Sequence, residues 1–399
     1  MMQKGTYFLA FLLVMICPLS SHAGGAFGNW SESFQVHGFL EQGFVATSGN
    51  QFYGNSRHGS FDLTQVGLNA AARPFNNVRF AVQGLYRRAG EQIPEELRLD
   101  YGLMDVTALD HPGFRSGVRL GRVKLPLGLY NESRDAPFTR PSIFLPQSLY
   151  FDRTRNVGMA TDGAQFYTDF SSPFGNFSFK ANLGASIPDN SLEFNVFGGS
   201  NRPGKFIGDF SAATQLAYDY SGGLIRVVFS AAWLISDYDK QSDPIIDSGE
   251  FEYQPYGLGI QYNGESLSLA SEYSIRNIRF ENFGRFLPDN EYNGEGYYFQ
   301  AGYKINHYIE LIGRYDVFYT DVSDRYGKKY EVRTGIPGSF FFAKDWMAAL
   351  RFNIIDNFMI RAEYHRVHGA GWVSLAENRN VRELERDWDL FAIEAAYQF

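Results

Sequence analysis

The sequence predicts an all-β protein, a transmembrane antiparallel β-barrel of sixteen strands. Three observations predict this fold. Segments of about ten residues alternate between apolar and polar side chains along the whole chain. Their number is even, and short connections alternate with long ones, which is typical of transmembrane barrels. The sheet is expected to close, because lipid offers no hydrogen bonds to the bare edge of an open sheet.

The alternation is clear in the stretch NNVRFAVQGLYR. Val78 and Phe80 lie on one face of the predicted strand, whereas Arg79 and Gln83 lie on the other. Successive side chains of a strand point to opposite faces, so one face is expected to meet lipid and the other a polar lumen. The same pattern predicts strands near residues 34–46, 61–73, 78–88, 97–107, 116–125, 162–170, 177–186, 208–219, 224–234, 251–262, 266–276, 295–304, 309–319, 346–354, 358–367 and 388–399.

The connections between these segments are of two kinds. Those after even-numbered segments are short and rich in turn residues, as in Pro112-Gly113 and Asn263-Gly264. Those after odd-numbered segments are long and polar. In bacterial outer-membrane barrels the short turns face the periplasm and the long loops face outward, so both chain ends are expected on the periplasmic side.

The start of the chain predicts export. Residues 1–23 are interpreted as a cleaved secretory signal peptide, with Lys4 ahead of an apolar run and Ser21-His22-Ala23 at the cleavage site. The apolar run is too short for a membrane-spanning helix. The predicted barrel domain is then residues 24–399. It contains no cysteine, so no disulfide is expected.

The last segment, LFAIEAAYQF, alternates and ends on Phe399. This ending resembles the C-terminal signature of Gram-negative outer-membrane proteins, whose assembly machinery reads a final Phe on the last strand. The resemblance implies the barrel assembly machinery as a partner through Phe399. It also implies outer-membrane lipid and lipopolysaccharide as the surroundings of the barrel.

The connection after the fifth segment differs from the others. Its sequence, GRVKLPLGLYNESRDAPFTRPSIFLPQSLYFDRTR, is long for an unstructured loop and rich in apolar residues, so it is expected to pack against the protein. In strand number, connection lengths, C-terminus and this loop, the chain resembles a sixteen-stranded Gram-negative porin. That family carries its constriction loop after strand five. The resemblance implies an inward-folded constriction loop at about residues 126–160, and a homotrimer.

Charged residues of this region form the predicted pore constriction: Arg122, Lys124, Glu132, Arg134, Asp135, Arg140, Asp152, Arg153 and Arg155. The family usually sets an acidic loop against arginines on the wall, and this basic loop departs from that pattern. The predicted wall residues are Glu41, Arg98, Asp100, Arg119, Lys180, Arg314, Arg351, Arg361, Glu363 and Glu394. Rings of Arg and Lys favour anions, and such a lining resembles that of anion- or phosphate-selective porins. Alternatively, the arginines pair with nearby carboxylates and only hold the loop in place.

The sequence predicts no enzyme and no cofactor. Nucleophilic catalysis needs Ser or Cys beside an oriented base, and the chain has no Gly-x-Ser-x-Gly or His-Glu-x-x-His motif. The acidic loops at 236–253 and 281–295 match no calcium-binding loop, so no metal site is predicted.

The predicted function is passive diffusion of ions and small hydrophilic solutes, with no nucleic-acid partner. Two alternatives stay open: a structural or adhesive surface barrel with a plugged lumen, and an outer-membrane barrel hydrolase.

Overall fold

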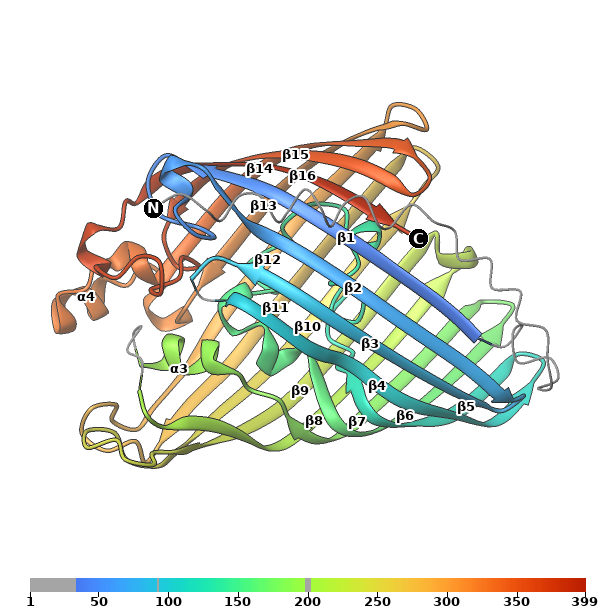
Figure 1. The fold of residues 1–399 in the computed structure, drawn as a ribbon, viewed down its shortest axis with the longest axis horizontal. Helices are drawn as coiled ribbons and strands as arrows, with labels where there is room; N and C mark the ends of the chain where they lie inside the picture. Colours follow the sequence, from blue (N-terminus) through green and yellow to red (C-terminus); the bar gives the residue numbers. More distant parts are fainter. Residues whose placement is uncertain (1–33, 92, 198–201) are drawn as a thin grey trace, which may run out of the picture.

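The computed structural model describes residues 34–91, 93–197 and 202–399, which form a closed antiparallel barrel of sixteen strands (Figure 1). Each strand pairs with its neighbours in the chain, and β1 closes the barrel against β16. The strands are β1 (Phe34–Thr47), β2 (Ser60–Phe75), β3 (Val78–Ala89), β4 (Ile93–His111), β5 (Phe114–Lys124), β6 (Ala160–Ser172), β7 (Gly175–Ser186), β8 (Lys205–Tyr220), β9 (Ile225–Asp239), β10 (Gly249–Asn263), β11 (Leu267–Glu281), β12 (Asn290–Lys304), β13 (Ile309–Tyr319), β14 (Phe342–Ile355), β15 (Phe358–Gly369) and β16 (Asp387–Gln398).

The predicted fold class is confirmed, and each of the sixteen predicted segments matches one strand to within a few residues at its ends. The largest difference is at β4, which is longer at both ends than the predicted 97–107. Its pairing with β3 and β5 shifts register at several points. Such bulges break the strict alternation on which the sequence pattern depends. The predicted signal peptide lies outside the described residues.

Two short helices, α3 (Asn190–Val196) and α4 (Lys328–Thr334), lie among the long loops at one end of the barrel (Figure 1). No helix in the described part of the chain is long and apolar enough to cross a membrane. The long loops of this end pack through two apolar clusters. One joins Phe52, Phe144 and Trp372 from three different loops, and the other joins Leu192 and Phe283. The loops of this end therefore pack against one another and against the loop that follows β5.

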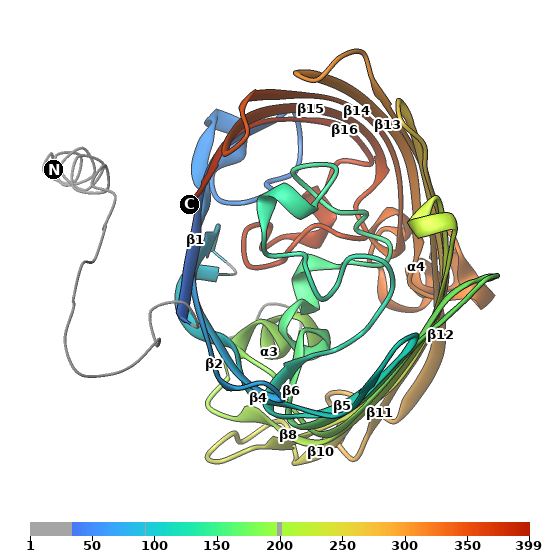
Figure 2. The same cartoon turned by 90° about the vertical axis from the view of Figure 1, so that its right-hand side faces the viewer.

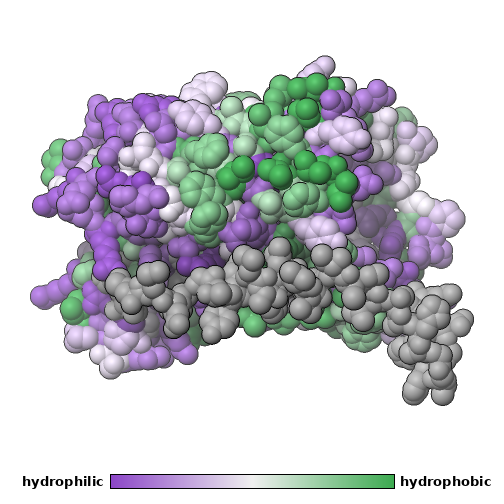
Figure 3. All heavy atoms as spheres, turned by 45° about the horizontal axis from the view of Figure 1, so that its top comes forward, coloured by the Kyte–Doolittle hydropathy of each residue, from purple (hydrophilic) through white to green (hydrophobic). Residues whose placement is uncertain are grey.

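The two faces of the barrel wall differ in chemistry. On β6, Phe166 and Phe170 are exposed on the outer face, whereas Gln165, next to Phe166, is fully buried on the inner face. Figure 3 shows hydrophobic side chains gathered over the middle of one side of the molecule, with hydrophilic ones toward the end that carries the long loops. An apolar outer band around a polar interior is the arrangement that a membrane barrel requires.

Closure of the barrel involves the last residue of the chain. The amide of Gly38 donates to the carbonyl of Phe399, and the amide of Phe399 donates to the carbonyl of Gly38, both at 3.0 Å. A Cβ at position 38 would overlap the Phe399 ring. Glycine at this position therefore lets the terminal aromatic ring lie flat against β1.

The outer band leads to a test on β10. Leu258 is 56% exposed on the outer face, so Leu258→Arg is expected to lower the free energy of unfolding in detergent or lipid by about 2–4 kcal/mol, since a cation near the bilayer midplane loses its hydration. Gln261→Arg, on the inner face of the same strand, is the control and should change it far less. Equal effects of the two substitutions in a urea titration would contradict the assignment of the faces.

Candidate functional site: the loop inside the barrel

Residues 125–159, which join β5 to β6, lie within the ring of strands (Figure 2). We call this segment the inner loop. Its amides reach opposite parts of the wall: Gly128 donates to the Ser230 hydroxyl on β9 at 3.0 Å, and Phe144 donates to the Glu363 carboxylate on β15 at 3.3 Å. The inner loop therefore crosses the lumen.

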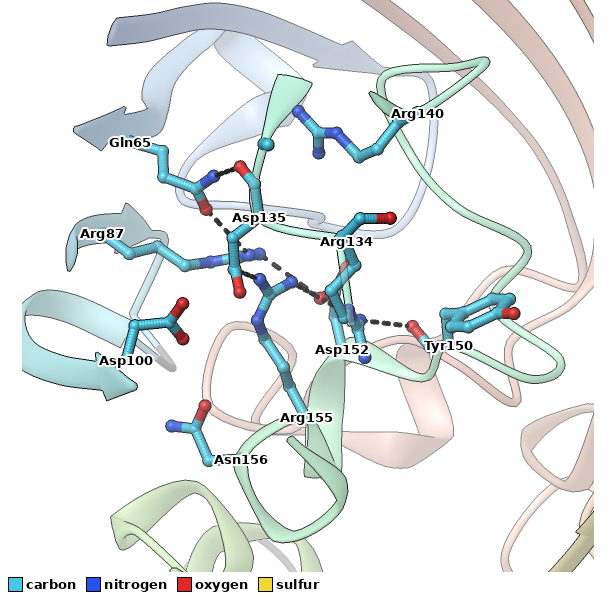
Figure 4. Close-up of polar contacts among 12 residues, drawn as sticks. Gln65, Arg87, Asp100, Arg134, Asp135, Arg140, Tyr150, Asp152, Arg155 and Asn156 are labelled. Atoms are coloured by element: carbon cyan, nitrogen blue, oxygen red, sulfur yellow. Dashed lines mark hydrogen bonds and ion pairs between the residues drawn. The ribbon is translucent and has the colours of Figure 1, made fainter. Parts of the chain in front are cut away.

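An ionic cluster at Asp152 fixes the base of the inner loop (Figure 4). Its carboxylate accepts a hydrogen bond from the Tyr53 hydroxyl at 2.6 Å and pairs with the guanidinium groups of Arg87, Arg134 and Arg155 at 3.2–3.3 Å. The three arginine side chains are at most 5% exposed. Burial raises the pKa of the Asp152 carboxyl, but the guanidinium charges outweigh this effect and hold it well below its ordinary value.

Asp135 is the second carboxylate of this cluster. It pairs with Arg155 and with the Lys124 ammonium, the latter at 2.5 Å, while Lys124 also pairs with Asp100 on β4 at 2.5 Å. The Gln65 side chain on β2 donates to the Asp135 carbonyl. Burial opposes ionisation of Asp135, yet Arg155 and Lys124 hold its pKa well below the ordinary value. Arg155 thus joins two carboxylates of the same loop.

The far part of the inner loop is held by β1, β15 and β16. The guanidinium of Arg140 donates to Glu41 on β1 and, at 3.0 Å, to the loop carbonyl of Ile143. Arg361 on β15 is 1% exposed and donates to the carbonyls of Pro137, Arg140 and Ser142 at 2.9–3.2 Å. A buried charged wall residue therefore satisfies three carbonyls of the loop.

Glu363, also on β15, accepts hydrogen bonds from the amides of Ile143 and Phe144, and its other contact is His365 at 3.2 Å. Arg314 on β13 donates to the hydroxyl of Ser142 at 2.9 Å. These wall side chains bind the loop, Glu363 through backbone amides and Arg314 through a side-chain hydroxyl, so their charges face the loop instead of an open pore.

The other predicted site residues also have partners. They pair as follows: Glu132 with Lys180, Arg153 with Asn195 and the Gly371 carbonyl, Arg98 with Asn156 and Asp100, Arg119 with Asp105 and Gln165, Arg351 with Asn353, and Glu394 with Arg361 and Arg140. These contacts fit the interpretation in which the basic residues hold the loop.

The placement of Arg122 is a correction. It pairs with Asp162 on β6 at 2.8 Å, and the two residues are directly opposite in the register. They share a strand face with Leu120 and Phe166, which are exposed on the outer side of the barrel. Arg122 therefore lies outside the lumen. The prediction placed it in the constriction together with the loop charges, although it interrupts the apolar face of its strand.

The predicted set omits the neutral wall that faces the inner loop. A small cavity of about 70 Å³ lies between Asn131 and Arg134 of the loop and Ser230, Tyr253 and Ser274 of β9 to β11. The wall residues Ser230, Tyr253 and Ser274 are uncharged, so a search of the sequence for charged side chains could not find them. Arg87 was also missed, although the alternation of its strand places it on the polar face.

No family model matches the chain, and no curated protein matches its sequence. Solved structures do match. The outer membrane channel DcaP of Acinetobacter baumannii superposes with a TM-score of 0.57 at 10% identity, over 92% of this chain and 97% of that one. The chain has the fold of the sixteen-stranded porins.

Two further structures share this porin fold. An anion-selective porin from Comamonas acidovorans has a TM-score of 0.55 at 10% identity, over 92% of this chain and 99% of that one. OmpT of Vibrio cholerae, an outer membrane protein in its trimer form, has a TM-score of 0.53 at 10% identity with the same coverage. At this identity the likeness shows the fold alone.

The Asp152 cluster can be tested by removing its charge. Asp152→Asn leaves three buried guanidinium groups with less countercharge, and breaking a buried ion pair costs about 3–5 kcal/mol. The inner loop is expected to detach and become sensitive to trypsin at Arg153 and Arg155 while the barrel stays folded. Asp162→Asn is the matched control, because its exposed pair contributes only about 0–1 kcal/mol. Equal resistance of both variants to trypsin would contradict the role of Asp152.

The loop between β15 and β16 provides a pH test. The Glu377 carboxylate accepts hydrogen bonds from the amides of Tyr53, Gly54 and Glu91 at 2.7–3.1 Å, and so joins three loops. Burial raises the pKa of Glu377 from 4.5 to about 7. The folded state therefore holds this proton more tightly than the unfolded state. Protonated Glu377 thus contributes fully to the stability of the folded state below pH 4.5, and this contribution is lost as the pH rises through about 7.

Amide hydrogen exchange of residues 51–56 should accordingly become faster between roughly pH 6 and 8, the range around the raised pKa of Glu377. The rates are first corrected for the intrinsic pH dependence of exchange. Glu377→Gln keeps an acceptor oxygen but has no titratable carboxyl group, so the corrected exchange rates should no longer depend on pH. A pH dependence that survives in this variant would assign the effect to another group.

Proposed function

We propose that the protein is an outer-membrane channel through which ions and small hydrophilic solutes diffuse passively. The observation that carries this proposal is a closed sixteen-stranded barrel with an apolar outer face and a polar inner face. Matching structures with the same fold include an outer membrane channel and an anion-selective porin. Diffusion requires no chemical step, only a water-filled path and side chains that bind a solute weakly enough to release it.

We place the narrowest part of the path between the inner loop and β9 to β11. Buried charges hold the loop to β1, β13, β15 and β16, and the buried side chains of Glu272 and Arg276 also bind it to β11. Beside these last contacts a small cavity remains, lined by the loop and by the small polar side chains Ser230 and Ser274. Solutes would pass Asn131 and Arg134 there. A path this narrow would exclude all but small solutes.

The selectivity proposed for this channel is a weak preference for anions. The cations in and beside the inner loop add little to the electric field in the lumen, because the wall carboxylates Glu41 and Asp100 neutralise Arg140 and Lys124. The support comes instead from the end with the short turns, where Arg73 and Arg79 are exposed and lie on the inner face. Cations that line a pore raise the local concentration of anions.

The surroundings of the barrel are part of the proposal. The chain would be exported through the signal peptide at residues 1–23, assembled through Phe399 and placed among lipid and lipopolysaccharide as a homotrimer. The trimer form of the Vibrio cholerae protein supports this oligomeric state.

A plugged surface barrel is the second candidate. Contacts of the inner loop with strands on opposite sides of the lumen favour it. We propose no hydrolase function, since the buried His365 bonds two carboxylates, Asp345 at 2.8 Å and Glu363 at 3.2 Å, and its ring contacts no serine hydroxyl in the described part of the chain.

Single-channel currents in a planar bilayer test the proposal. The wild type should give discrete steps of small conductance, with a reversal potential that favours chloride in a potassium chloride gradient. Deletion of residues 137–145 removes the part of the loop near β15 and should raise the conductance severalfold. A silent wild type beside a conducting deletion variant would favour the plugged barrel, and a potassium preference would remove the proposed selectivity.

A further inference from the structure

A group of arginines lines the lumen at the end with the short turns. Arg73 of β2, Arg79 of β3, and Arg115 and Arg119 of β5 surround a polar cavity of about 140 Å³. We call them the mouth arginines. In outer-membrane barrels this end faces the periplasm. The cavity also contains two carboxylates, Asp105 and Asp169, so guanidinium groups outnumber carboxylates there.

The carboxylates of the cavity are already engaged. Asp105 accepts hydrogen bonds from Arg119 at 3.2 Å and from the Tyr167 hydroxyl at 2.9 Å, and Asp169 accepts one from Ser178 at 2.7 Å. The register places Asp105 opposite both Arg79 and Arg119 on the two neighbouring strands. One carboxylate thus lies between two guanidinium groups.

Two of the mouth arginines have no partner among the described residues. Neither Arg73 nor Arg79 takes part in a hydrogen bond or ion pair there, and both are exposed. Like charges on neighbouring strands destabilise a sheet when nothing neutralises them. This contrasts with the inner loop, where each buried cation faces a carboxylate or a carbonyl.

The cavity is suited to an anion with several oxygens. A guanidinium group presents its donors in a planar fork that matches carboxylate and phosphate oxygens. One water molecule needs roughly 10–15 Å³ of such a cavity, so this volume accommodates a small polyatomic anion and some water. The inward position of the side chains turns them away from lipid headgroups.

We infer that the mouth arginines form a binding site for a small soluble oxyanion, of the phosphate or carboxylate class, at the periplasmic end of the lumen. The inference deepens the proposed function and rests on it in one respect, because the lumen must open to solvent at this end. Arg73 and Arg79 bind the anion directly. Asp105 orients Arg119 and competes with the anion for its charge.

Calorimetric titration of the purified, detergent-solubilised chain with inorganic phosphate tests the site at low ionic strength. The wild type should bind phosphate saturably. The double variant Arg73→Gln, Arg79→Gln should bind phosphate at least roughly tenfold more weakly, because each substitution removes a charged hydrogen-bond donor. Asp105→Asn should bind more tightly, since it removes the competing negative charge while keeping an acceptor for Tyr167.

The control is Arg88→Gln. Arg88 lies at the other end of β3, where it is exposed and pairs with Asp62, so phosphate binding should not change. Absence of saturable binding by the wild type, or equal losses in the double variant and in Arg88→Gln, would overturn the site. The titration needs no ion flux. A chain that binds phosphate but passes no current would therefore contradict the proposed channel and still support the site.

Discussion

Charge neutralisation within a dry part of the lumen is the constraint on which the interior depends. Arg155 lies between Asp135 and Asp152 of its own loop, and Arg87 reaches the same cluster from the wall. A buried charge without a partner is far more costly than a paired one. The inner loop can therefore leave this position only by separating several ion pairs together, which makes its place in the lumen well defined.

The same constraint limits what the loop charges can do for a solute. Arginines that attract anions in an open pore would have to face water, and Arg140 and Arg361 instead face carboxylates and loop carbonyls. Arg73 and Arg79, which form no hydrogen bond or ion pair among the described residues, lie at the other end of the lumen. In the channel that we propose, size selection and charge selection therefore lie at different depths.

The strands could be predicted from sequence because the alternation is local and each strand contributes it independently. Bulges limited the prediction of the ends, as at β4. The pairing of loop charges could not be predicted, because it depends on which wall residue a distant strand places opposite the loop, as with Glu41 and Arg140. Arg122 was assigned to the lumen, whereas it pairs with Asp162 on the outer face; Lys124, two residues later on the same strand, does reach the inner loop, so alternation alone does not separate the two.

Hydrogen exchange of the inner loop tests the central claim, that buried ionic contacts fix this loop inside the barrel. The amides of Ile143 and Phe144 donate to Glu363, so the peptide from 140 to 150 should exchange as slowly as the strands at neutral pH. The loop at 240–248, between β9 and β10, supplies the comparison for exposed backbone. Exchange of the inner loop as fast as that of the exposed part of this loop would contradict the account.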